Sequence, residues 1–344
     1  MALSEAKIEA IALQVIKTLY TRFKTFPNDP SGIRNAPFHM AFIRAFQDKL
    51  EENVTSIPVF ISLSSWFHGL NTTLGQTFFE KVSHILCDGT KREFKMLKIS
   101  QEQQTTVTEI VTDLKNNVQP PDTFRENGLI YKNNTLQNKE IPNFTADCYF
   151  EDIERIVAIE IKTVKPNSGI FKNEKDKILS AKAALKNANP TKEIFFYLAF
   201  PFDPLSTEPT GYNKNAFMKY SIDFTKFFAP DEILLADELW NFLSGDENTM
   251  QQIIDVINEI ATPQFVENYD FLNDAQNRVT DRDQYIQKLI DWKLFSEALL
   301  VRNEAELLIK IGDNRRMLRK FNQPIFKEEE YNIERLIALK PFLN

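Results

Sequence analysis

Apolar residues recur every three or four positions in three segments near the start of the chain, a spacing that predicts amphipathic helices. These segments are Glu5 to Phe23, His39 to Glu52 and Leu74 to Leu86. The Asp88-Gly89 pair ends the third, because such pairs favour turns. From about Pro230 onward the spacing is helical again. We therefore expect helices at both ends of the chain.

The middle of the chain has shorter apolar runs that are typical of β-strands. Strands are predicted over Ala146 to Glu151, Ile156 to Val164 and Glu193 to Phe200, with a helix over Glu174 to Asn187. The polar segment 116–142, rich in Asn and Pro, is predicted as a loop. This order predicts an α/β or α+β fold in which helices flank a mixed central sheet, with an appended helical C-terminal region.

The second predicted strand carries charges inside its apolar run, in the sequence AIEIKTVK. Residues two apart lie on the same face of a strand, so Glu160 and Lys162 point to one side. Ile159 and Ile161 point to the other side and are predicted to face the core. The charged face therefore needs a functional or structural explanation.

A short link after Glu151 predicts an antiparallel hairpin between the first two strands, and its centre places Asp147 opposite Glu160. Two facing carboxylates repel each other, and a bound cation removes that cost. Such hard oxygen ligands suit Mg²⁺, which completes its shell with waters and phosphates. Lys162 is then placed to orient water, to stabilise charge on phosphorus or, with a lowered pKa, to take a proton. Together these residues predict metal-assisted hydrolysis of phosphodiester bonds.

Glu-x-Lys alone is a weak signal, since it also occurs at Glu5 to Lys7 and Glu93 to Lys95. The alternative is an exposed edge hairpin with an ordinary ion pair. The buried strand and the lysine-rich helix that follow favour the active-site interpretation.

Charge is unevenly distributed in this chain of formal net charge −7. The segment from Asp231 to Asp274 contains no Lys or Arg, so the remainder is weakly basic. Lysines concentrate between Lys162 and Lys186, and a second basic cluster lies in the C-terminal region. Either solvated helix faces or a polyanionic partner such as double-stranded DNA explains these clusters. The candidate DNA contacts are Lys165, Lys172, Lys175, Arg315, Arg316 and Arg319.

Several other classes of protein are disfavoured. The longest apolar run, Ile194 to Phe202, is about half of a membrane span, and the amphipathic first helix is unlike a signal peptide, so no membrane is expected and the location is cytoplasmic. No P-loop motif is present, so no ATP is expected. Two cysteines are too few for a disulfide framework or a Cys-rich zinc site. Glu80 and His84 share a helical face, but no His-Glu-x-x-His pattern supports a zinc hydrolase.

The segments TADCYF and AIEIK resemble the PD-(D/E)XK nuclease signature, in which an Asp and a Glu-x-Lys on neighbouring strands bind Mg²⁺. Ala146 stands where that signature often has Pro. The resemblance implies Asp147, Glu160, Lys162 and the helical Glu80 as catalytic residues. It implies Asp147, Glu160 and Ile161 as metal-binding positions.

The segments SSWFHGLNTTLGQTFFEK and KTVKPNSGIFKNEKDKILSAKAAL resemble type II restriction endonucleases of the TdeIII kind, over roughly residues 30–205. This resemblance implies a homodimer that cuts a short palindromic DNA site, GGNCC, leaving 5′-phosphate and 3′-hydroxyl ends. We expect a catalytic core over residues 1–228 and a helical region for dimerisation or DNA contact over 229–344. The alternatives are a structure-specific repair or recombination nuclease and a non-catalytic DNA-binding protein on the same scaffold.

Overall fold

The computed structural model describes residues 2–26, 57–162, 168–221 and 223–343. The chain divides into two compact units. Residues 1–3 and 79–254 form one, and residues 4–78 and 255–344 form the other. The sequence-based division at residue 228 stays a prediction. The boundaries of the two compact units lie at other residues. The first helix groups with the C-terminal helices, and the segment after residue 228 still contributes to the unit that contains the sheet.

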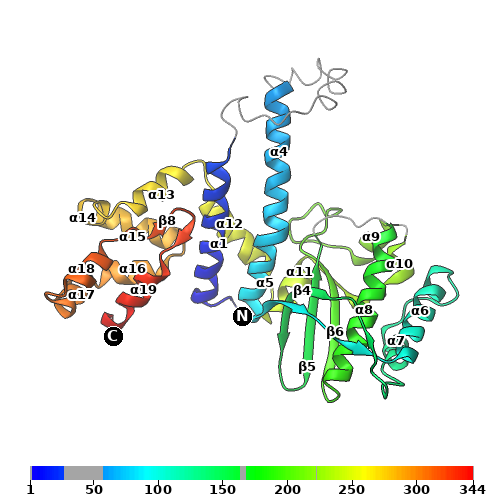
Figure 1. Cartoon of the computed structure of the whole chain (residues 1–344). Helices are drawn as coiled ribbons and strands as arrows, with labels where there is room; N and C mark the ends of the chain where they lie inside the picture. Colours follow the sequence, from blue (N-terminus) through cyan, green and yellow to red (C-terminus); the bar gives the residue numbers. More distant parts are fainter. Residues whose placement is uncertain (1, 27–56, 163–167, 222, 344) are drawn as a thin grey trace. The chain divides into compact units, whose positions relative to one another are not determined.

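A five-stranded sheet forms the centre of the first unit, in the order β1-β4-β5-β6-β7 (Figure 1). The β1, β4 and β5 strands pair antiparallel, whereas β5, β6 and β7 pair parallel. This mixed sheet confirms the predicted fold class. Its strands are β1 (Thr90–Phe94), β4 (Phe144–Glu151), β5 (Arg155–Ile161), β6 (Glu193–Phe200) and β7 (Ile233–Leu235).

The hairpin of β4 and β5 has the predicted register. Cys148 pairs with Ile159, and the pairing continues to Glu151 with Ile156. The turn is stabilised by Asp152, whose Oδ1 accepts hydrogen bonds from the backbone N–H groups of Glu154 at 2.8 Å and Arg155 at 2.9 Å. The register therefore directs Asp147 and Glu160 to adjoining positions at the open end of the hairpin.

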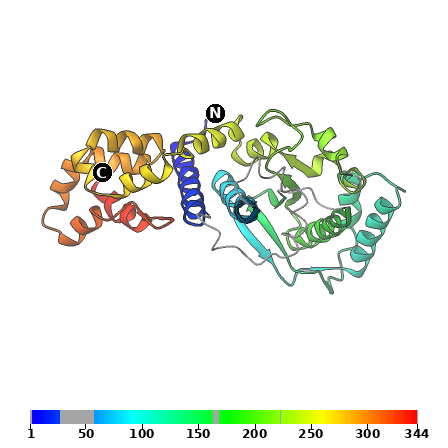
Figure 2. The ribbon, with the colours of Figure 1, turned by 90° about the horizontal axis from the view of Figure 1, so that it is seen from above.

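Helices cover both faces of the sheet (Figures 1 and 2). Tyr197 of β6 packs on Phe242 of α11, whereas Phe200, on the opposite face, packs on Phe217 of α9 and Phe224 of α10. Both faces of β5 are buried near its middle, so the prediction that only one side is core was incomplete. The helices of this unit are α5 (Phe79–Cys87), α6 (Gln101–Lys115), α7 (Thr123–Ile130), α8 (Ser168–Ala188), α9 (Lys214–Lys219), α10 (Phe224–Phe227), η4 (Pro230–Glu232) and α11 (Asp237–Ser244).

The prediction of a loop over residues 116–142 was wrong in part, because this segment contains helix α7. Asp122 caps this helix, and its Oδ1 accepts a hydrogen bond from the backbone N–H of Arg125 at 2.8 Å. A short strand, β3 (Lys139–Glu140), also lies here and pairs with β2 (Lys98–Ile99). Local capping outweighs the loop-like composition.

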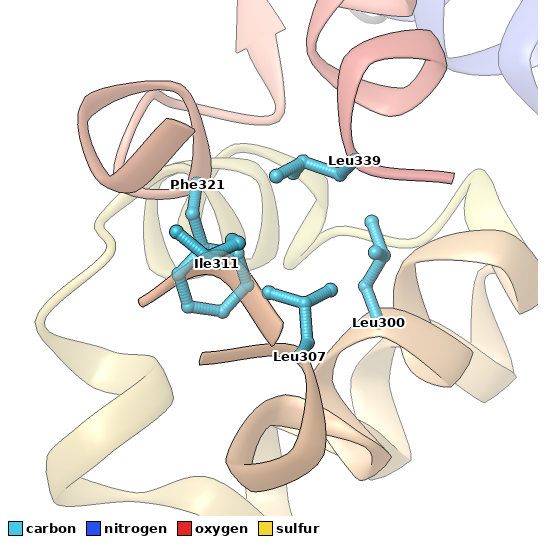
Figure 3. Packing of buried hydrophobic residues seen from close by; sticks show 5 residues of the cluster. All are labelled: Leu300, Leu307, Ile311, Phe321 and Leu339. Carbon is cyan, nitrogen blue, oxygen red and sulfur yellow. The ribbon is translucent and has the colours of Figure 1, made fainter. Parts of the chain in front are cut away.

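Among the described residues of the second unit, the regular elements are helices and the β8-β9 hairpin. Leu300, Leu307, Ile311, Phe321 and Leu339 point toward one another in its core (Figure 3). The α12 helix (Thr249–Ile260) spans the division between units. The remaining elements are α1 (Glu5–Lys24), α4 (Ile57–Thr73), the π-helix η3 (Leu74–Phe78), α13 (Phe265–Asn273), α14 (Asn277–Thr280), α15 (Arg282–Asp291), α16 (Phe295–Arg302), α17 (Glu304–Ile311), α18 (Arg315–Phe321), β8 (Phe326–Lys327), β9 (Glu330–Tyr331), α19 (Ile333–Leu339) and η5 (Lys340–Phe342).

The predicted helix over His39 to Glu52 lies outside the described residues. Within the described part of the chain, no helix combines the length and apolar character that crossing a membrane requires.

Candidate active site

Asp147 lies near the open end of the hairpin, with its side chain 17% exposed. Its Oδ2 accepts a hydrogen bond of 2.9 Å from the backbone N–H of Ile161 on the neighbouring strand. The ring of His84 on α5 lies with Nε2 2.6 Å from the backbone oxygen of Asp147. These two contacts fix both the carboxylate and the main chain. His84 therefore supports the main chain of β4 in the structure.

Glu160 lies on β5 and Lys162 comes directly after its last residue, and the two form an ion pair, with Lys162 Nζ 2.6 Å from Glu160 Oε1. The backbone N–H of Lys162 donates a 2.8 Å hydrogen bond to the carbonyl of Ala199 on β6, which anchors the end of the strand. The structure thus brings Asp147, Glu160, Ile161 and Lys162 together, on a part of the sheet that is held from both neighbouring strands.

Helix α8 contributes a second ion pair to the same place. Glu174 Oε1 lies 3.0 Å from Lys162 Nζ, and Glu174 Oε2 lies 2.5 Å from Lys177 Nζ. Lys177 Nζ also lies 3.1 Å from Glu160 Oε2. Two carboxylates and two ammonium groups therefore alternate around a ring. The charges balance, which offsets the cost of holding them where they are only 12–27% exposed.

Glu80 on α5 reaches the site through Lys91 of β1. Lys91 Nζ lies 3.0 and 2.8 Å from the two carboxylate oxygens of Glu80 and 3.7 Å from Asp147 Oδ1. The predicted helical Glu is thus on the same side of the sheet as Asp147, with one ammonium group between them.

Burial and neighbouring charges shift several pKa values at the site, of which those of Asp147 and Lys162 bear on the chemistry. Burial raises the pKa of Asp147, and the charge of Glu80 adds to this effect, against the Ile161 hydrogen bond and the charges of Lys91 and Lys162. Burial lowers the pKa of Lys162, but the charges and hydrogen bonds of Glu160 and Glu174 outweigh it, so the pKa is raised overall. The raised pKa favours an ammonium group. The alternative of Lys162 as a base with a lowered pKa is therefore not supported.

Sequence reasoning did not identify Lys91, Glu174 or Lys177 as site residues. Lys91 lies on a strand that was not predicted. Glu174 and Lys177 were recognised only as part of a charged helix. Their three-residue spacing places them on one helix face, but the sequence does not show which face meets the sheet.

The candidate DNA contacts fall into different environments. Lys165 lies outside the described residues, and Lys172 is exposed on α8. Lys175 is fully buried, with Nζ 2.6 Å from Glu126 and 2.7 Å from Glu232. This corrects the prediction for Lys175, because an ammonium group enclosed by two carboxylates in the interior has no access to a phosphate.

The remaining candidates lie on α18 in the helical unit. Arg315, Arg316 and Arg319 are all exposed, and no ion pair involves them within the described residues. Their guanidinium groups are therefore accessible, as a contact with DNA phosphates requires.

The side chains at the hairpin fit a hard divalent cation. Asp147 and Glu160 offer carboxylate oxygens from paired strands, and Mg²⁺ binds through one or two carboxylates while keeping several waters. Within the described residues, no group of three or more His, Cys, Asp or Glu side chains is arranged to hold an ion. Carboxylate oxygens of this kind are ligands that hard cations such as Mg²⁺ accept, whereas Zn²⁺ is bound mostly by nitrogen and sulfur.

The chain is similar to known restriction endonucleases. The model of the family described as "Type II restriction endonuclease, HinfI" matches residues 3–261. The type II restriction enzyme MjaII of Methanocaldococcus jannaschii is 41% identical over 366 residues, which cover 100% of this chain and 99% of the relative. No solved structure matches the chain.

Proposed function

Since the chain belongs to the HinfI family of type II restriction endonucleases, we propose that Asp147, Glu160 and Lys162 form its Mg²⁺-dependent catalytic site. The enzyme is a type II site-specific deoxyribonuclease, as the family match and the identity to a restriction enzyme indicate. The observation that carries the proposal is the hydrogen bond from Ile161 to Asp147, which links Asp147 to the Glu160–Lys162 segment.

Asp147 and Glu160 would hold the ion, with Ile161 as the third metal-binding position. Bound Mg²⁺ would polarise the scissile phosphate and lower the pKa of a water molecule. Glu80 would assist a second ion or hold a water of the first. These positions, Asp147, Glu160, Ile161 and Glu80, lie on helices and strands of the first unit. Backbone hydrogen bonds of those elements therefore maintain their geometry.

Lys162 would act as a cation. Its ammonium group is held by Glu160 and Glu174, at 2.6 and 3.0 Å, and its raised pKa keeps it protonated. In this state it can donate hydrogen bonds to the attacking water or to a phosphate oxygen, and it stabilises negative charge that develops on the phosphate.

The prediction of a type II restriction endonuclease is confirmed, although the matching family is described by HinfI and not by TdeIII. The substrate we propose is a short palindromic site in double-stranded DNA, cut to give 5′-phosphate and 3′-hydroxyl ends. GGNCC follows from the TdeIII resemblance alone. A symmetric target is most simply cut by a symmetric dimer, so we also propose a homodimer, which sedimentation of the intact chain would test.

Digestion of a fully sequenced, unmethylated viral DNA tests the proposal. We expect discrete fragments with Mg²⁺ and intact DNA with a chelator, and mapping the fragment ends gives the site and the stagger. Fragments with Mg²⁺ that do not end at one sequence would favour a structure-specific nuclease. Binding of DNA without cleavage under any divalent ion would favour a non-catalytic protein on the nuclease scaffold.

A further inference from the structure

Lys91 occupies an unusual place among the charges of the site. Its ammonium group contacts both oxygens of Glu80 and lies 3.7 Å from Asp147 Oδ1. The other oxygen of Asp147 is already bonded to the Ile161 backbone. The Asp147 oxygen that faces Lys91 is therefore not the one that the Ile161 backbone holds.

The two carboxylates are more enclosed than the lysine. The side chains of Glu80 and Asp147 are 12% and 17% exposed, whereas Lys91 is 50% exposed. Largely buried carboxylates need a counter-charge. A long, half-exposed lysine can supply that charge and can also withdraw its ammonium group into water at little cost.

An ion bound to Asp147 Oδ1 would lie about 2 Å from that oxygen, so it would be within roughly 6 Å of the ammonium group. Like charges at this separation repel each other strongly where the surroundings are only partly solvated. The ammonium group and a divalent cation therefore compete for Asp147.

We propose that Lys91 is an internal competitor of the divalent cation: it neutralises Glu80 and Asp147 in the metal-free protein and moves away when the ion binds. This inference rests on the proposed metal site at Asp147. It assigns Lys91 a positioning role, because the residue would keep the Asp147 carboxylate in place for the ion that replaces it.

Titration of the intact protein with Mn²⁺, without DNA and at fixed pH, tests the competition. Lys91→Met removes the charge but keeps most of the side-chain length. We expect it to bind Mn²⁺ about tenfold more tightly than the unsubstituted protein, since one repelling charge has gone. Lys91→Arg keeps the charge and should show no gain.

Lys95→Met is the matched control. Lys95 lies just after β1 and pairs with Glu93 at 2.8 Å, and its side chain is 55% exposed. Its removal changes the net charge by the same amount away from the site, so Mn²⁺ affinity should stay within about twofold of the unsubstituted value.

Asp147→Asn separates the inference from the proposed metal site. If Asp147→Asn leaves Mn²⁺ binding unchanged, the metal site itself is wrong. If Asp147→Asn abolishes binding but folded Lys91→Met binds no more tightly than the unsubstituted protein, only the competition is wrong. Circular dichroism of each variant would establish that it is folded.

Discussion

Glu174 shows how a residue outside the hairpin is expected to act on the reaction. Its Oε1 lies 3.0 Å from the ammonium group of Lys162, and the side chains of Glu174 and Lys162 are only 13% and 23% exposed, which strengthens this contact relative to one in water. Glu174 does not need to contact the substrate. By holding Lys162 from the side of α8, it fixes the direction in which the ammonium group is presented.

We expect Glu174→Gln to lower the single-turnover cleavage rate by about tenfold, the effect of losing one charge-assisted hydrogen bond to Lys162. DNA affinity and melting temperature should change little. Glu174→Asp should recover part of the rate, because it keeps the charge.

Asp176→Asn is the control for this change, because Asp176 is exposed on the same helix. It should cleave at the unsubstituted rate. A Glu174→Gln rate equal to that of the control would show that Glu160 alone positions Lys162.

The sequence identified Asp147, Glu160, Lys162 and Glu80 because two of these lie inside an apolar strand, where a charge needs an explanation. It could not distinguish the roles of the lysines on α8. The lysines of α8 look alike in the sequence, yet Lys175 is buried and Lys172 is exposed. The difference depends on partners from α7 and η4, which only the folded chain brings together.

Among the elements, α8 is held to its neighbours by buried charges. Lys175 Nζ lies 2.6 Å from Glu126 of α7 and 2.7 Å from Glu232 of η4, and all three side chains are at most 2% exposed. The same helix carries Glu174 and Lys177 into the site. The buried network therefore sets the position of the helix that supports Lys162.

We expect Lys175→Met to lower the free energy of unfolding by about 3–5 kcal/mol, since it leaves two buried carboxylates without their cation. Urea denaturation measures this loss. Adding Glu126→Gln and Glu232→Gln should restore part of it by removing the unpaired charges.

Lys172→Met, on the exposed side of α8, should change the free energy of unfolding by less than about 0.5 kcal/mol. Lys175→Met could instead unfold with the same free energy as the unsubstituted protein and bind DNA more weakly. That result would support the prediction that Lys175 contacts DNA.

The pattern predicted some elements better than others. The β4-β5 hairpin was predicted with its register because a short link and the alternation of residues leave little choice. The β1 strand was missed because its sequence, TKREF, is charged and it lies at the edge of the sheet. The β7 strand has only three residues, Ile233–Leu235, and is defined by its pairing with β6.

For the whole molecule, the helical unit is proposed to add affinity for DNA through α18. Arg315, Arg316 and Arg319 are exposed there, in a chain whose formal net charge is −7. A local basic surface is therefore needed to attract a polyanion.

Replacing these three arginines together with alanine should weaken binding to cognate and non-cognate DNA alike. The plot of log affinity against log salt concentration should become less steep, its slope decreasing in magnitude by about two to three, if each arginine neutralises one phosphate. Arg302→Ala, an exposed arginine on α16, is the control. An unchanged slope would show that α18 does not contact DNA.

The organisation of the whole chain was harder to predict than its active site. Helical spacing shows that a segment is helical, but it does not show which helices pack together. The first helix groups with the C-terminal helices through contacts such as the stacking of Phe23 on Phe265. Such pairing between the two ends of a chain leaves no local signal in the sequence.

The most direct measurement is single-turnover cleavage of a mapped site by Asp147→Asn and Lys162→Ala, beside DNA affinity measured with Ca²⁺. We predict that each variant binds the site with near-normal affinity and cleaves it at least about a hundredfold more slowly, because metal binding or charge stabilisation is lost. Glu102→Gln, exposed on α6, should cleave normally. Cleavage by folded Asp147→Asn or Lys162→Ala at the unsubstituted rate would contradict the assignment of the β4-β5 hairpin as the catalytic site.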